Sequence, residues 1–303
     1  MELKTFPMTR WDDRNLLRVL GTVLVFASAV AFSLSGVLTR LISSETWTIV
    51  CWRGLFGALL VATYVRMRDN ARPLRVVFRL GLKGWLLATV GSLASFAFVL
   101  SFKLTYVGNV AVIYATVPFA AAVFEWFILS ERMRPQTVLA AVVSFLGVAI
   151  MFAQSVGSVQ LLGDAVAVLM TIGMALYMVL IRAMKNVPVV LAGAASALQL
   201  FLVGLIFADP VNVSTRDAIL LVLFGAVFAI GVILWTEGTR RISAAEAGLI
   251  GSLEAPVAIL LAWLIIAEIP PTASFIGGAL VLLAVFGHAL TDFFRAKPAE
   301  TVG

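Results

Sequence analysis

The amino-acid sequence predicts an all-α integral membrane protein with ten transmembrane helices, arranged as two inverted five-helix repeats. The first observation is composition: 62% of the 303 residues are hydrophobic and 13% are charged, whereas soluble domains have about 45–50% and about 25%. The second is a succession of ten apolar runs, each close to the roughly 20 residues that a helix needs to cross a bilayer. The third is a stretch that occurs twice, once in each half. Together they exclude a water-soluble protein, and the run lengths favour helices over a barrel, whose strands alternate over about 10 residues.

The ten expected helices follow one another with short polar or proline-containing breaks. Turn and charge signals mark most of these breaks, for example at 68–73, 132–135 and 269–271. The weakest break lies at 103–105, and we expect two helices there because a single one would exceed forty residues. The first run is longer than the core of a cleavable signal, about 7–15 residues, so we expect it to be retained. The expected spans are 17–40, 46–67, 83–102, 106–129, 135–153, 161–182, 189–207, 217–236, 243–266 and 272–291.

Lysine and arginine residues predict the orientation, because cytoplasmic loops of membrane proteins are enriched in them. With the N-terminus in the cytoplasm, eighteen of the 22 fall in inside segments. Three fall outside, at Arg40, Lys103 and Arg216, and Arg53 lies within a helix. We therefore expect a multi-pass protein of the cytoplasmic (inner) membrane with both termini in the cytoplasm. The net charge of +6 fits this topology, and we expect no nucleic-acid partner.

The repeated stretch indicates how the two halves are related. A shift of 137 positions aligns Trp126 with Trp263 and Glu131 with Glu268. The same shift brings Pro118 to within one position of Pro256. Each half has five expected helices, and an odd number inverts the second half relative to the first. We expect a first repeat over 1–153, a second over 161–291 and a cytoplasmic tail over 292–303.

These features resemble the ten-helix EamA-type branch of the drug/metabolite transporter superfamily. The resemblance rests on the proline-to-glutamate stretches, on the glycine-bearing runs that follow them (Gly147 and Gly277), and on the tryptophan–arginine–glycine segment 52–55. It implies a basket of helices with a central cavity lined by helices one, three, four, six, eight and nine. Small multidrug members of the superfamily carry a proton-coupling glutamate in the first helix, but here no acid occurs between Asp13 and Glu45. That coupling mechanism therefore does not carry over.

Glu254 is the first candidate for a functional residue. It lies about eleven residues into the expected span 243–266, hence near the bilayer midplane, where a carboxylate costs roughly 2.5–3.5 kcal/mol and usually faces water or a partner. It would bind a substrate ammonium group or a proton; alternatively it is protonated, or bonds a backbone group that Pro256 frees. Pro118 and Pro256 lie within helices and are expected to kink them, either as flexing points for gating or as static bends.

Three further charged residues have gating or coupling as one interpretation. Arg53 lies about 10 Å from the outer end of its helix and would pair with a substrate carboxylate, reach outward, or hold a structural ion pair. A structural role is favoured, because the resemblance places helix two outside the cavity. Glu246 and Glu125 lie near cytoplasmic helix ends and form either an inner gate with Arg240, Arg241 or Arg132, or solvated or paired helix ends. The second interpretation is favoured for Glu125.

A set of polar and aromatic side chains on the expected cavity helices would line a binding site, since such sites combine apolar walls with a few aimed polar groups. Three of them, Ser28, Phe32 and Ser35, recur at helical spacing. Packing between helices is the alternative for each, because small and hydroxyl residues are favoured there as well. The candidates are Ser28, Phe32, Ser35, Ser92, Phe96, Tyr114, Thr116, Thr171, Met174, Tyr177, Trp235 and Ser252.

The sequence favours a secondary transporter that exports a small metabolite, an amino acid or a similar molecule, by alternating access. An importer of a vitamin or nucleotide-like metabolite such as riboflavin is the alternative. A non-transporting scaffold or an intramembrane enzyme is a remote one, because a single Cys51 and a single His288 leave little for catalysis. No P-loop is present, so a proton, an ion or the substrate's own gradient would drive transport. We expect no cofactor and no metal; the expected partners are a small molecule and the lipid bilayer, and the oligomeric state stays open.

Overall fold

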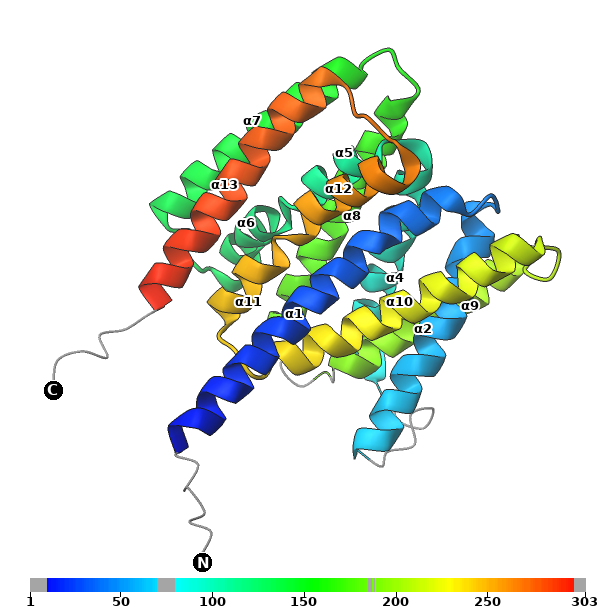
Figure 1. Cartoon of the computed structure of the whole chain (residues 1–303), viewed down its shortest axis with the longest axis horizontal. Coiled ribbons are helices and arrows are strands. Elements are labelled where there is room, and N and C mark those ends of the chain that lie inside the picture. The colour runs from blue at the N-terminus through cyan, green and yellow to red at the C-terminus, as the bar shows by residue number, and fades with distance from the viewer. Residues whose placement is uncertain (1–9, 70–79, 185–186, 188, 297–303) are drawn as a thin grey trace, which may run out of the picture.

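The computed structural model describes residues 10–69, 80–184, 187 and 189–296, and every regular element within them is a helix (Figure 1). Several residues behind the topology and tail predictions lie outside the described residues: Lys4, Arg72, Arg75, Arg79, Lys185, Lys297 and 298–303. The helices are α1 (Arg10–Leu41), α2 (Thr46–Asp69), α4 (Gly81–Leu104), α5 (Val107–Tyr114), α6 (Val117–Leu129), α7 (Pro135–Ser155), α8 (Gln160–Ala183), α9 (Val189–Phe207), α10 (Thr215–Thr239), α11 (Ala244–Gly251), α12 (Glu254–Ile266) and α13 (Thr272–Ala296).

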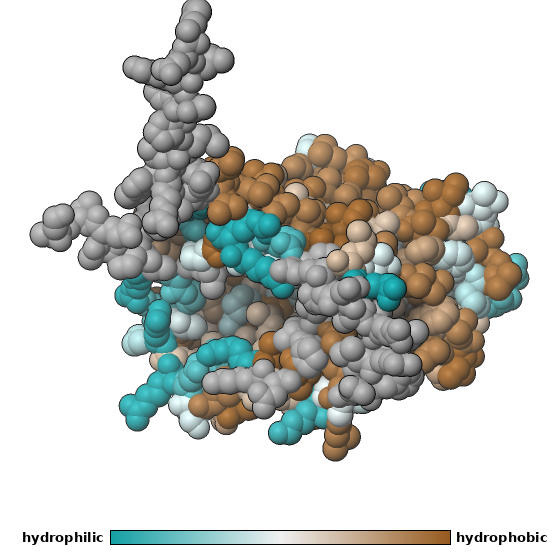
Figure 2. All heavy atoms as spheres, turned by 90° about the horizontal axis from the view of Figure 1, so that it is seen from below, coloured by the Kyte–Doolittle hydropathy of each residue, from teal (hydrophilic) through white to brown (hydrophobic). Residues whose placement is uncertain are grey.

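Most of these helices are long and apolar enough to cross a bilayer. Eight spans within the described residues have that character, with α5 and α6 forming one span and most of α11 with α12 forming another. Two further apolar helices, Thr46–Leu60 of α2 and Leu191–Phe207 of α9, are shorter. Many large hydrophobic side chains are exposed, and Figure 2 shows broad hydrophobic areas on the face seen from below. A surface of this kind is suited to lipid, since on a soluble protein it would promote association.

The two halves pack against each other in a repeated pattern. α1 packs along α10, and its counterpart α8 packs along α4 in the same way. Likewise α1 packs on α12, and α8 packs on α6. α2 packs on its counterpart α9, and α7 on α13. Figure 1 shows α7 and α13 side by side at one edge, and α1 begins at the end of the molecule where α13 ends. The most extensive contacts therefore join the two halves, and the seam between them runs through the centre of the molecule.

A pair of glycines sets the close approach of α7 and α13. A Cβ added to Gly147 would lie 2.6 Å from the carbonyl oxygen of Gly277, and one added to Gly277 would lie closer still to the carbonyl oxygen of Gly147. Real Cβ atoms do not approach that closely, so neither position accepts a side chain without a shift of the helices. Small residues serve the same purpose wherever membrane helices pack tightly.

Two of the expected spans are each divided into two helices, whereas one continuous helix with a proline kink was expected for each. The expected span 106–129 consists of α5 and α6, and residues 115–116 separate them. The expected span 243–266 consists of α11 and α12, and residues 252–253 separate them. At both breaks the chain keeps a helical handedness but tightens, with hydrogen bonds between residues three apart. The breaks occupy equivalent positions in the two halves.

The prolines explain why the new helices begin where they do. Pro118 is the second residue of α6 and Pro256 the third residue of α12. Proline has no N–H and a fixed φ, so it fits the first turn of a helix, where an N–H has no partner within the helix. The missing donors leave the carbonyls four residues earlier, those of Tyr114 and Ser252, without their usual helical partner. Each break therefore has one backbone carbonyl without its helical partner.

The ends of the two divided spans are also alike. α6 ends at Ser130 with φ 57°, and α12 ends at Ala267 with φ 52°; both lie in the left-handed region and 137 positions apart. The N–H of each cap donates to a carbonyl five residues earlier, that of Glu125 or that of Ala262. Such a cap satisfies carbonyls that the helix leaves free. The repeat seen in the sequence thus recurs in the backbone.

Candidate functional site

A cavity lies where the two divided spans meet. The space inside it is about 10 Å³, room for about one water molecule. Helices α1, α4 and α5 of the first half and α12 of the second half form its wall, which corresponds to four of the six cavity helices that the resemblance implies. The lining residues are Phe32, Ser33, Phe98, Phe102, Ala111, Tyr114, Glu254, Ala255 and Ala258. Phe32, Tyr114 and Glu254 are the members of the predicted set that the structure brings together here.

Glu254 stands at the second break, as the first residue of α12. A helix N-terminus carries partial positive charge, which favours a carboxylate at that position. The Ser33 hydroxyl of α1 donates to the backbone carbonyl oxygen of Glu254 at 2.8 Å, so α1 holds the start of α12 in place. The Glu254 carboxylate accepts no hydrogen bond from any described residue. It is therefore open to a cationic group or a proton in the cavity.

Aromatic residues are four of the eight other residues that line the cavity. Tyr114, the last residue of α5, stands at the first break and meets Phe98 edge to face with ring centroids 6.2 Å apart. Phe98 in turn contacts Phe102 at 4.8 Å, and Phe32 contacts Phe228 of α10 at 6.3 Å. Apolar walls with a few polar groups are typical of small-molecule sites. The two breaks thus face one cavity, and the acid and the phenol are the titratable groups of its lining.

Arg53 of α2 is buried directly behind this aromatic wall, with 6% of its surface exposed. Its Nη1 donates to the Ser95 hydroxyl of α4 at 2.6 Å. Its guanidinium carbon lies 4.1, 5.4 and 5.5 Å from the ring centroids of Phe228, Phe98 and Phe224. Arg53 does not reach the surface, and no carboxylate of the described residues lies within ion-pair distance of it. The choice between a structural role and a role in binding or gating stays a prediction. The neighbouring Phe98 belongs to the cavity wall.

Most hydroxyl groups predicted to line the site bond elsewhere. Four of them donate to a carbonyl three or four residues earlier in their own segment: Ser28, Thr116, Thr171 and Ser252. Ser92 of α4 donates to Gln199 of α9 at 2.6 Å and so joins two helices. A back-bond of this kind satisfies a hydroxyl without a ligand. The structure does not bring these five residues to the cavity.

The other predicted lining residues pack between helices. Ser35 is buried in α1. Phe96 packs on a tryptophan of α2, with ring centroids 4.4 Å apart. Met174 packs against hydrophobic clusters of the core, Tyr177 lies against α4, and Trp235 lies against α11 close to the second break. None of these five residues lines the cavity in this structure, and their part in substrate binding stays a prediction.

Glu246 joins α11 to the first helix at the end of the molecule where α1 begins. Its carboxylate accepts from the Ser243 N–H, and its own N–H donates to the Ser243 hydroxyl, each at 3.2 Å, which completes a capping box. Glu246 also forms an ion pair with Arg18 of α1. The contact joins the two halves, as a gate requires, but with a partner that the sequence did not indicate.

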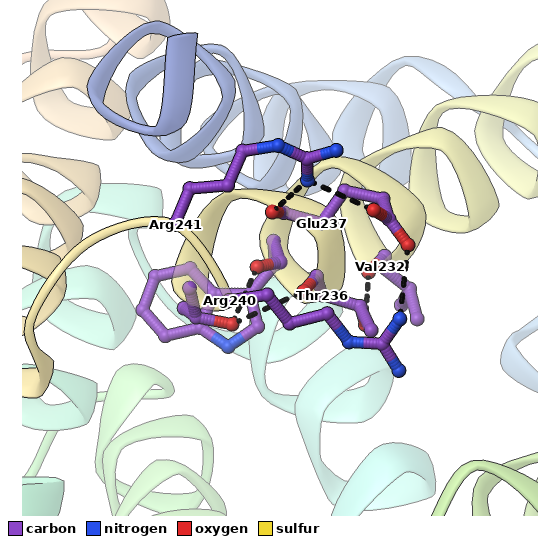
Figure 3. A network of polar contacts seen from close by, with 7 residues as sticks. Val232, Thr236, Glu237, Arg240 and Arg241 are labelled. Carbon is purple, nitrogen blue, oxygen red and sulfur yellow. Dashed lines mark hydrogen bonds and ion pairs between the residues drawn. The ribbon is translucent and has the colours of Figure 1, made fainter. Parts of the chain in front are cut away.

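The arginines expected to pair with Glu246 pair within α10 and the turn after it. Arg240 Nη1 lies 3.3 Å from Glu237 Oε1, and Arg241 Nη1 lies 2.8 Å from Glu237 Oε2 (Figure 3). Residues three and four apart are neighbours on a helix surface, so Glu237 is the nearer acid. This cluster stabilises the end of α10 and leaves Glu246 to Arg18.

Two further ion pairs are related by the repeat. Arg40 at the end of α1 lies 3.4 Å from Glu268, which follows α12, and Arg182 at the end of α8 lies 2.9 Å from Glu131, which follows α6. Arg182 also pairs with Glu125, in place of the arginines predicted from the sequence. Each pair joins one half to the other, and the helices that carry them end at opposite ends of the molecule (Figure 1).

The two related pairs differ in burial. The Glu268 side chain is 7% exposed and accepts hydrogen bonds from the N–H groups of Val107 at 2.5 Å and Gly108 at 3.4 Å, at the start of α5. The Glu131 side chain is 52% exposed. Exposed ion pairs contribute about 0–1 kcal/mol, whereas a hydrogen bond to a charged group contributes about 1.5–3 kcal/mol. Removal of the Glu268 carboxylate is therefore expected to cost more, because this carboxylate is buried and also binds the start of α5.

Some residues of the site were missed from the sequence. Ser33 and Phe98 line the cavity but were not among the candidates, although Ser33 adjoins Phe32 on the predicted face. Arg40 and Arg182 were considered only as topology signals. Each stands near the end of the first helix of its repeat. These equivalent positions could have predicted that the two arginines form equivalent contacts.

Fold and site together define a polytopic membrane protein of two related helical units, with its polar groups at their seam. The sequence model of the EamA-like transporter family matches residues 19–153 and again residues 161–289. The chain belongs to the EamA-like transporter family, as the resemblance predicted, and it is a membrane transporter of small substrates.

Two other comparisons bear on this chain. One solved structure, titled only "Crystal structure of protein", matches it with a TM-score of 0.65 and 20% identity, over 93% of this chain and 99% of that one. At that identity the match supports the fold alone. No curated protein matches the sequence.

Proposed function

We propose that the protein is a secondary transporter that exports a small metabolite, an amino acid or a similar molecule, by alternating access. The observation that carries this proposal is the meeting of two helix breaks at one cavity, with Glu254 at the start of α12. Interrupted helices in corresponding positions of two repeats are where secondary transporters bind substrate and coupling ions. A carboxylate within the membrane usually faces such a path.

The proposed arrangement in the inner membrane has ten crossings, with α2 and α9 supplying two besides the eight longer spans. Residues 1–153 form the first repeat, residues 161–291 the inverted second repeat, and residues 292–303 a cytoplasmic tail. The exchange of helix contacts between the halves supports this arrangement, as does the common end at which α1 begins and α13 ends. The distribution of lysine and arginine assigns that end to the cytoplasm.

Alternating access would then rely on the contacts at the two ends of the seam. The pair of Arg40 with Glu268 would close the outer side, and the pairs of Glu131 and Glu246 with their arginines would close the inner side. Pro118 and Pro256 would let the short helices reorient at the breaks as the halves rock. A proton, an ion or the substrate gradient would drive the cycle.

Flux in proteoliposomes tests the proposal. The purified protein is assayed by counterflow with a panel of amino acids, nucleosides and riboflavin. We expect accumulation of at least one amino acid, and we expect Glu254→Gln to lower its rate at least tenfold, because the carboxylate is the charged group of the cavity lining. Glu45→Gln is the matched control, since Glu45 is exposed outside the helices.

Each outcome has a defined meaning. No flux of any solute above that of empty liposomes would contradict the proposal. Flux of riboflavin or a nucleoside without any amino acid would support the importer alternative instead. Full activity of Glu254→Gln would remove Glu254 from the site.

A further inference from the structure

Arg53 has binding capacity that the protein itself does not use. A guanidinium group has five N–H donors in a fixed fork, and the hydrogen bonds seen for Arg53 run from Nη1 to the Ser95 hydroxyl at 2.6 Å and, more weakly, to the Ser95 carbonyl at 3.4 Å. The buried Nε has no hydrogen-bond partner. Leaving a buried donor unpaired is costly, especially on a charged group. An oxygen of a bound ligand would remove that cost.

The charge of Arg53 is also uncompensated. Within the described part of the chain, no carboxylate lies within ion-pair distance of the guanidinium, and phenylalanine rings surround it. Ring faces attract a cation but offer no acceptor for its N–H groups. A purely structural buried arginine would normally be paired with a carboxylate in a forked geometry. The surroundings of Arg53 therefore suit an anion that arrives from outside.

The cavity is the nearest source of such an anion. Phe98 contacts Arg53 and lines the cavity, and another ring against Arg53, that of Phe228, packs on the lining residue Phe32. A cation behind one part of the aromatic wall and an acid in the wall itself are thus adjacent to the same space.

We propose that Arg53 binds the carboxylate of the transported substrate while Glu254 binds its ammonium group, so that the site selects zwitterionic α-amino acids with an apolar side chain. The inference rests on the proposed transport function and narrows its substrate class. The guanidinium fork matches the two oxygens of a carboxylate, and the phenylalanines accommodate the side chain. Phe98 contacts Arg53 and lines the small cavity, so the proposal requires Phe98 to reorient and the cavity to widen when the substrate binds. A ligand with only one of the two charges leaves the other protein charge unpaired and binds more weakly.

Three related probes test this selectivity in proteoliposomes: L-leucine, 3-methylbutylamine, which lacks the carboxylate, and 4-methylpentanoate, which lacks the ammonium group. We expect the unmodified protein to move leucine at least tenfold faster than either analogue. Arg53→Gln is expected to raise the KM for leucine at least tenfold and to leave 3-methylbutylamine transport unchanged or faster. Arg53→Lys retains the positive charge but not the forked donor geometry. Its KM for leucine is expected to lie between that of the unmodified protein and that of Arg53→Gln.

Controls separate binding from folding. Ser95→Ala removes the protein partner of Arg53 but keeps its charge, so the preference for leucine over the amine is expected to persist. The thermal unfolding midpoint of each variant is measured in detergent. Equal losses of leucine and amine transport in Arg53→Gln, in proportion to a lowered midpoint, would assign Arg53 a structural role and overturn the inference.

The flux results also distinguish this inference from the broader proposal. Transport of a nucleoside or riboflavin, unaffected by Arg53→Gln, would overturn the amino-acid assignment and leave the transporter function standing. Equal rates for leucine and 3-methylbutylamine in the unmodified protein would do the same. Absence of flux for every solute of the wider panel would overturn both.

Discussion

Replacing Glu268 with alanine is expected to open the end of the seam that we assign to the outer side. The carboxylate is 7% exposed and accepts hydrogen bonds from the N–H groups of Val107 and Gly108, where the start of α5 also favours negative charge. Hydrogen bonds to a charged group contribute about 1.5–3 kcal/mol, and the partly exposed pair with Arg40 adds about 0–1 kcal/mol. A loss of about 2–3 kcal/mol from the closed state shifts a closed–open equilibrium roughly 30- to 150-fold.

The assay follows the reactivity of one thiol in the cavity. Ala258 lines the cavity and is 4% exposed, so Ala258→Cys is introduced into a chain in which the sole cysteine, Cys51, is changed to alanine. A membrane-impermeant methanethiosulfonate is applied to right-side-out or inside-out vesicles. Glu268→Ala is expected to raise the labelling rate from the outside at least about 30-fold and not to raise it from the inside.

Glu131→Ala is the matched control, because Glu131 holds the equivalent position in the other repeat. Its side chain is 52% exposed, and an exposed pair is worth about 0–1 kcal/mol. We therefore expect at most a roughly fivefold increase, and only from the cytoplasmic side. Unchanged labelling after Glu268→Ala, or similar increases from the same side after both substitutions, would refute the reasoning.

Two stability predictions follow from buried contacts. Asp164 is fully buried and accepts a hydrogen bond from the Thr105 hydroxyl at 2.6 Å, so Asp164→Ala is expected to cost about 1–3 kcal/mol and to lower the thermal unfolding midpoint in detergent. Asp209→Ala is the control, because Asp209 is exposed, and it is expected to be neutral. Equal midpoints for the two variants would contradict the stabilising role of Asp164. Gly147→Ala is expected to destabilise by about 1–3 kcal/mol because its Cβ would meet the α13 backbone. The Cβ of Gly287→Ala in α13 meets no atom within 4 Å, so this variant is expected to be neutral or stabilising. If denaturation showed Gly287→Ala to be less stable than Gly147→Ala, the close approach of α7 and α13 would not be the reason for glycine at position 147.

The helical class and the repeat were predictable because both rest on local sequence. Long apolar runs predict helices at any position, and the alignment of Glu131 with Glu268 anticipates the equivalent caps at Ser130 and Ala267. The breaks were less accessible. A proline within an apolar run either kinks a helix or begins a new one, and Pro118 and Pro256 do the latter.

The site was only partly predictable because its contacts are not local. Periodicity places Ser28 on a helix face, but it does not show that the hydroxyl bonds to its own helix. Arg53 was judged from the position of its helix, whereas its surroundings come from α4 and α10. Glu254 was found because a carboxylate in an apolar run is costly in any fold, and that cost is visible in the sequence alone.

The orientation of the two divided spans is the most direct test of an inverted repeat at a shared cavity. Ser130 and Ala267 are exposed, have the same left-handed backbone and lie 137 positions apart, so Ser130→Cys and Ala267→Cys can be labelled separately, each without Cys51. An inverted repeat predicts that an impermeant reagent reaches the thiol at 130 only from the cytoplasmic side and the thiol at 267 only from the outside. Labelling of both positions from one side would contradict it.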